Sequence, residues 1–219
     1  MSTPETTPTT APGTTPDAAA TPAARRPRPL TTRYLMTCGA IGAATGVLLI
    51  PVNLVAFGAL AAAPTLVAAL VGFWLVGGVI ALALLQRPGA ALITSVISGI
   101  FAIPTPAGLT AVLTMAMVGV ALELGFAVTL YRVWSPWLFY VSTAVIAAVY
   151  LTMVFPAYEM GSASTLAQVM FVLTLFVSMV GAAWLGLLLA RRLAATGVTR
   201  GLAPVRRPAA TTATTTTAP

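Results

Sequence analysis

Carboxylates are scarce in this chain of 219 residues, which has four acidic side chains and no histidine. Glu5 and Asp17 lie in a polar N-terminal stretch, whereas Glu123 lies inside a long apolar one. A charge at membrane depth costs about 3 kcal/mol, so such a residue normally faces protein or water. Glu123 is therefore either a ligand contact or proton relay, or a protonated or hydrogen-bonded side chain that fastens helices together.

Glu159 follows Tyr158 in a segment between two apolar stretches. A carboxylate beside an aromatic ring can bind a cationic ligand, with the ring supplying a cation–π contact. The alternative is a solvated loop carboxylate. Small-molecule sites are mostly apolar with a few polar groups. Five further side chains could complete such a substrate site, although each can equally be explained by packing: Asn53, Trp74, Thr114, Tyr150 and Gln168.

The remaining reactive groups do not favour catalysis. The chain has no lysine and a single cysteine, Cys38. The commonest general base, the commonest zinc ligand and the Schiff-base nucleophile are thus missing. No Gly-x-x-x-x-Gly-Lys-Ser/Thr loop for ATP occurs. We expect no catalytic residue, no metal site and no cofactor in this chain, and we expect that it is not an enzyme.

Apolar stretches must position these side chains, because 58% of the residues are hydrophobic and only 7% are charged. A soluble domain carries about a quarter charged residues. About 20 helical residues cross the hydrocarbon core of a bilayer. The sequence predicts an all-α integral membrane bundle of about six helices, the third of them short for a full crossing, at 34–57, 65–85, 89–103, 109–130, 136–155 and 165–190.

All eleven basic residues are arginines, and they fall in four clusters. Arg87 and Arg132 stand alone between apolar pairs, and the other clusters flank the first and last apolar stretches. Arginines mark the cytoplasmic side of a membrane protein. We therefore expect a multi-pass protein of the cell membrane with both termini cytoplasmic. The arginines lie beside spans, so we expect them to face anionic lipid headgroups of the bilayer rather than nucleic acid.

The two tails differ from the apolar region in composition. Residues 1–32 and 196–219 are rich in Thr, Pro and Ala. Such segments bury too little apolar surface to offset the entropy of an ordered chain. We expect both to be disordered cytoplasmic tails around one transmembrane substrate-binding domain at 33–195.

Small residues recur at a spacing of four on the first apolar stretch, and Ala40 and Ala44 form one such pair. Small residues at this spacing let two helices approach closely in lipid. The face could pack against the protein's own helices or bind another membrane subunit, and the spacing alone does not decide between these.

Three segments resemble a known family: 72–79 (GFWLVGGV), 86–92 (QRPGAAL) and 123–132 (ELGFAVTLYR). Together with the six expected spans, they are similar to the substrate-binding S components of energy-coupling-factor (ECF) transporters. The likeness is greatest to the YkoE-like group, which is associated with thiamin and its hydroxymethylpyrimidine precursor. It covers about residues 33–195, and neither tail contributes to it.

The resemblance implies a six-helix module for vitamin uptake that captures its ligand from outside the cell. It also implies partners, namely a transmembrane coupling subunit and two cytoplasmic ATPase subunits that use the ATP. In S components the coupling subunit often contacts small residues spaced by four on the first helix, which here are Ala40 and Ala44.

Two other functions remain open. A proton-coupled secondary transporter would use Glu123 as its relay, although such transporters are usually built from internal repeats. A ligand-free structural membrane subunit would need none of the polar residues named above. An intramembrane enzyme is the least favoured interpretation, because it requires a nucleophile with a base or a metal cluster.

Overall fold

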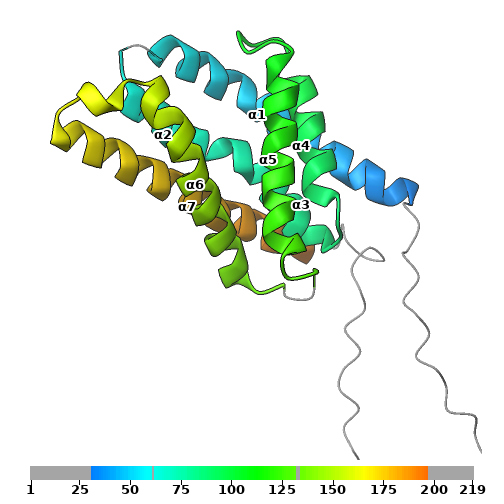
Figure 1. Cartoon of the computed structure of the whole chain (residues 1–219). Coiled ribbons are helices and arrows are strands. Elements are labelled where there is room, and N and C mark those ends of the chain that lie inside the picture. The colour runs from blue at the N-terminus through cyan, green and yellow to red at the C-terminus, as the bar shows by residue number, and fades with distance from the viewer. Residues whose placement is uncertain (1–30, 61, 132–133, 197–219) are drawn as a thin grey trace, which may run out of the picture. The chain divides into compact units, whose positions relative to one another are not determined.

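A computed structural model describes residues 31–60, 62–131 and 134–196, which form helices joined by short turns with no β-strand in these ranges (Figure 1). The predicted disordered tails at 1–32 and 196–219 lie almost entirely outside the described residues, as does Arg132. The helices are α1 (Thr32–Ala59), α2 (Pro64–Val71), α3 (Phe73–Leu85), α4 (Ala90–Phe101), α5 (Thr110–Ala127), α6 (Pro136–Ala157), the 3₁₀ turn η1 (Met160–Ser162) and α7 (Thr165–Ala195).

The predicted class, an all-helical membrane bundle, is confirmed. In the described part of the chain five helical stretches are long and apolar enough to cross a membrane: α1, Pro64–Leu85, α5, α6 and α7. The sixth, α4, has 12 residues and so spans only about 18 Å, well below a hydrocarbon core of about 30 Å. The predicted short third span is therefore short in the structure as well.

The second predicted span is interrupted at Gly72, which separates α2 from α3. The Ser178 hydroxyl of α7 accepts a hydrogen bond from the Gly72 N–H at 3.0 Å and donates one to the Ala69 carbonyl at 2.6 Å. A side chain at position 72 would overlap the Ser178 backbone. The interruption therefore has a local cause, a polar side chain of α7 placed against glycine.

Helix α4 lies between α1 and α5, and Figure 1 shows α4 and α5 side by side. A Cβ at Gly42 of α1 would lie 2.8 Å from the Thr94 carbonyl oxygen, and a Cβ at Gly119 of α5 would lie 2.8 Å from the Leu92 Cα. Glycine thus lets both neighbours approach the backbone of α4. The Thr45 and Ser98 hydroxyls, 2.6 Å apart, add a buried hydrogen bond between α1 and α4.

The start of α1, the turn between α3 and α4, and the end of α7 lie at one end of the bundle, which we call the arginine end. The Tyr34 hydroxyl donates to the Pro88 carbonyl at 3.4 Å, and Arg33 and Leu193 line the same groove. The described ends of the chain therefore lie together, as an even number of crossings requires. Tyrosines near helix ends are common at the membrane interface, but the side chain of Tyr34 is fully buried.

Candidate functional site

Three of the predicted substrate-site residues meet at the end of the bundle opposite the arginines. The indole N–H of Trp74 donates to the Asn53 side-chain oxygen at 3.1 Å. The Trp74 and Tyr150 rings meet edge to face, with centroids 6.5 Å apart and planes at 80°. The three residues come from α1, α3 and α6. We call them the Asn53–Trp74–Tyr150 triad.

The position of the triad follows from the helices that carry it. Asn53 lies about 30 Å along α1 from its start at the arginine end. Trp74 is the second residue of α3, just after the interruption at Gly72. Asn53 is buried, whereas Trp74 and Tyr150 are partly exposed. The triad therefore combines a fixed amide with two accessible aromatic rings, which suits a flat polar ligand.

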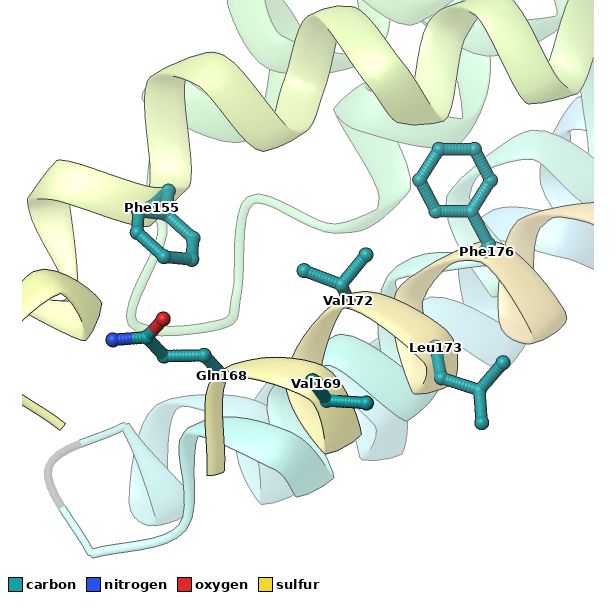
Figure 2. Close-up of a pocket in the computed structure, with 6 residues that line it drawn as sticks. All are labelled: Phe155, Gln168, Val169, Val172, Leu173 and Phe176. Carbon is teal, nitrogen blue, oxygen red and sulfur yellow. The ribbon is translucent and has the colours of Figure 1, made fainter. Parts of the chain in front are cut away.

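Gln168 lies apart from the triad, in a groove of about 460 Å³ between α6 and α7 (Figure 2). Figure 2 shows its amide and the Phe155 ring facing each other across this groove. The amide nitrogen donates to the Ala163 carbonyl at 3.0 Å, which fixes the side chain. The other lining residues are Val169, Val172, Leu173 and Phe176. Gln168 is thus the polar group of an otherwise apolar groove.

Sequence reasoning missed the two phenylalanines of this groove. Phe176 follows Gln168 by eight residues, so the two lie on one face of α7 with Val172 between them. This spacing is the sequence signal that could have identified Phe176 as a neighbour of Gln168. Phe155 precedes Pro156 near the end of α6, and nothing in the sequence pairs it with Gln168.

The other predicted substrate-site residues do not contact the triad through a hydrogen bond or ring contact within the described ranges. Thr114 lies partly buried on α5. The Tyr158 ring lies against Phe171 with centroids 5.8 Å apart, and burial raises the pKa of the Tyr158 phenol. Glu159 is exposed and has a positive φ of 51° where the chain turns into η1. Its carboxylate is therefore free to meet solvent or a ligand.

Glu123 occupies a different place, close to the arginine end. Its side chain is 9% exposed. One carboxylate oxygen accepts a hydrogen bond from the Ala91 N–H at 2.8 Å, and the other accepts one from the Tyr131 hydroxyl at 2.6 Å. Ala91 belongs to the first turn of α4, whose free N–H groups and helix dipole favour a negative charge. The carboxylate thus ties α5 to α4, as expected of a helix contact.

Tyr131 is a partner of Glu123 that sequence reasoning did not identify. Leu130 and Tyr131 both have positive φ values, 51° and 55°, which are uncommon for residues other than glycine. The Tyr131 N–H donates to the Phe126 carbonyl at 3.0 Å, closing the turn after α5. Burial and the hydrogen bond to Glu123 raise the pKa of the Tyr131 phenol, so it remains a proton donor. The unusual backbone is therefore held by a strong side-chain hydrogen bond.

The predicted partner-binding residues, Ala40 and Ala44, are both exposed on α1. They line a groove of about 450 Å³ between α1, α3 and α7, together with Arg33, Met36, Thr37, Ile41, Thr45, Ile80, Leu84 and Leu193. Gly42 and Gly46 lie on the opposite face of the helix, against α4. The small residues of α1 thus lie on two faces of the helix. The glycine face packs against α4, and the alanine face is exposed.

Comparison with known proteins places these features in a family. No curated protein matches the chain. A solved structure described as "Crystal structure of an S-component of ECF transporter" is similar, with a TM-score of 0.70 and 19% identity over 80% of this chain and 91% of that chain. This likeness concerns the fold, and at that level it confirms the expected resemblance to ECF S components. A family model described as "ABC-type cobalt transport system, permease component" matches residues 33–149, just over half of the chain. The chain therefore belongs to this family of membrane transport components.

Proposed function

We propose that this protein is the substrate-binding membrane subunit, or S component, of an ATP-driven ECF-type importer, and that its ligand is thiamin or the hydroxymethylpyrimidine precursor of thiamin. The observation that carries the ligand class is the Asn53–Trp74–Tyr150 triad. Its three side chains come from three helices, yet they meet through one hydrogen bond and one ring contact.

The triad suits an aminopyrimidine. The Asn53 oxygen accepts from Trp74, which leaves its amide N–H groups to donate to a ring nitrogen. The exposed parts of the Trp74 and Tyr150 rings can contact a flat heterocycle through their edges or faces. Thr114, Tyr158 and Gln168 extend the polar set along the same half of the bundle. If the ligand is thiamin itself, Glu159 offsets its positive charge.

A bare metal ion fits these residues less well, although cobalt appears in the description of the family. The chain has no histidine, and no three His, Cys, Asp or Glu side chains come together in the described ranges. Divalent transition metals bind best to imidazole, thiolate or carboxylate groups. The donor set of the triad is an amide and two aromatic rings, which favours an organic ligand.

Transport requires partners, because the chain has no ATP-binding loop. In the proposed complex, two cytoplasmic ATPase subunits supply the energy and a transmembrane coupling subunit transmits it. The exposed face at Ala40 and Ala44 suits this coupling subunit, since small residues allow a partner helix to approach closely. Both termini would be cytoplasmic, so the triad would lie near the outer surface and capture ligand from there.

Binding to the purified full-length protein tests the proposed ligand. We expect thiamin or hydroxymethylpyrimidine to bind, and Trp74→Ala to weaken binding at least tenfold, because one ring contact and the hydrogen bond to Asn53 are lost. Trp184→Ala is the matched control, since Trp184 is 58% exposed on α7. Isothermal titration calorimetry measures both variants.

If Trp74→Ala and Trp184→Ala bind the ligand equally well, the triad is not part of the binding site. A well-folded protein that binds neither compound would instead favour the ligand-free structural subunit. Uptake into vesicles that needs a proton gradient but no ATP would favour the secondary transporter.

A further inference from the structure

The groove at the arginine end has a polarity gradient along its length. Arg33 lines it where α1 begins, and Thr37 lies one turn further on. Beyond them the α1 lining is small or aliphatic as far as Thr45, whose hydroxyl is already hydrogen-bonded to the Ile41 carbonyl and to Ser98. Leu84 and Ile80 of α3 add an aliphatic wall that begins at the arginine end. A cationic mouth that leads into an apolar channel has the same order of polarity as a phospholipid, in which a phosphate precedes an acyl chain.

The length of the groove agrees with one membrane leaflet. Its lining on α1 runs from Arg33 to Thr45, which is about 18 Å by helical rise. Half of a hydrocarbon core is about 15 Å thick. A chain that enters beside Arg33 would therefore end near the middle of the membrane. A groove of about 450 Å³ is large enough for one such chain.

Charge at the mouth favours an anion. Arg191 and Arg192 are exposed in the last turns of α7, directly before Leu193, which lines the groove. Neither carboxylate in the described ranges lines it: Glu123 is hydrogen-bonded to Ala91 and Tyr131, and Glu159 follows the far end of α6. Basic grooves between membrane helices bind anionic lipid headgroups.

We infer that this groove holds one acyl chain of an anionic phospholipid, whose phosphate is bound by Arg33 with Arg191 and Arg192 beside it. The site exists whether or not the protein is an importer. One consequence does rest on the proposed function: the lipid would cover Ala40 and Ala44, so a coupling subunit must displace it. The lipid would then oppose assembly by stabilising the free subunit.

Native mass spectrometry of the purified full-length protein tests this, with phosphatidylglycerol and phosphatidylcholine of identical acyl chains as probes. We expect one phosphatidylglycerol to remain bound at least fivefold more tightly than phosphatidylcholine. Arg33→Gln should weaken phosphatidylglycerol binding about fivefold, the change expected from one arginine near a headgroup, and leave phosphatidylcholine unaffected. Equal retention of the two lipids by the unmodified protein would overturn the inference.

A second pair of variants tests the groove itself. Ala40→Trp fills it and should remove the retained phosphatidylglycerol, whereas Ala148→Trp, at an exposed alanine of α6 outside the groove, should not. Identical lipid retention in the two variants would show that the lipid binds elsewhere, and the inference would fail. Thermal unfolding of each variant checks that it is folded, and Arg33→Gln gives the same test without filling the groove.

Co-purification with the coupling subunit separates this inference from the proposed function. If Ala40→Trp keeps the lipid but loses the coupling subunit, the groove is a protein interface only and the lipid inference is wrong. If it loses the lipid but still binds the coupling subunit, the lipid site stands and the docking face assigned to Ala40 and Ala44 is wrong.

Discussion

At the scale of single residues, Glu123 shows how a carboxylate can be accommodated inside an apolar bundle. Its two oxygens accept hydrogen bonds from the first turn of α4 and from Tyr131. Each bond pairs a polar group that has little access to water, and leaving such a group unpaired is costly. Both carboxyl oxygens of Glu123 are engaged in hydrogen bonds between helices and turns. A proton relay through Glu123 would therefore have to break one of these bonds in each transport cycle.

Replacing Glu123 should therefore reduce stability rather than abolish transport. Glu123→Gln retains one acceptor oxygen and should lower the free energy of unfolding by about 1 kcal/mol, whereas Glu123→Leu leaves both donors unpaired and should cost about 2–3 kcal/mol. Denaturant titration in detergent measures both. Combination with Tyr131→Phe should be non-additive, because the two residues share a hydrogen bond. If a folded Glu123→Gln protein no longer transports its ligand, the proton-relay interpretation of Glu123 would be favoured again.

At the scale of helices, the short α4 depends on glycines in its neighbours. We expect Gly42→Ala to lower the free energy of unfolding by about 1–3 kcal/mol, because the new methyl group would overlap Ile97 and the Thr94 carbonyl. Gly39→Ala is the matched control on the same helix, since no atom lies within 4 Å of its added Cβ. That variant should be neutral or more stable. Equal effects of the two substitutions would show that α4 does not depend on close contact with α1.

The helices themselves were predictable, but their rotations were not. Hydropathy and the arginine clusters located six apolar stretches, including the short one. Membrane helices are apolar all round, however, so no polar stripe shows which face is buried. The same run of small residues therefore left open whether Ala40 or Gly42 faces the protein. The interruption at Gly72 involves Ser178, a distant residue that no local sequence pattern connects to it.

The same limit applies to the candidate site. Asn53, Trp74 and Tyr150, three members of the predicted substrate set, lie at one end of the bundle, because the rise per residue fixes their depth along each helix. The rotation of each helix about its own axis decides which of the predicted substrate-site residues meet. Thr114 and Gln168 are not part of the triad. The pairing of Glu123 with Tyr131 depends on two residues with positive φ, a backbone conformation that neither Leu nor Tyr predicts.

At the scale of the whole molecule, the proposed capture of ligand from outside depends on which end of the bundle faces the cytoplasm. The native Cys38 is fully buried, so a single added cysteine can report accessibility. Gly161 is exposed in η1, and Thr196 is exposed at the end of α7, on opposite ends of the bundle. A membrane-impermeant thiol reagent on intact cells should label Gly161→Cys but not Thr196→Cys, and permeabilised cells should label both.

Labelling of Thr196→Cys alone would place the arginines outside and the triad inside, because the arginine end and the triad lie at opposite ends of the same helices. Labelling of both on intact cells would mean that α7 does not cross the membrane between these two positions, and the assignment of the arginine end and the triad to opposite sides of the membrane would then be wrong.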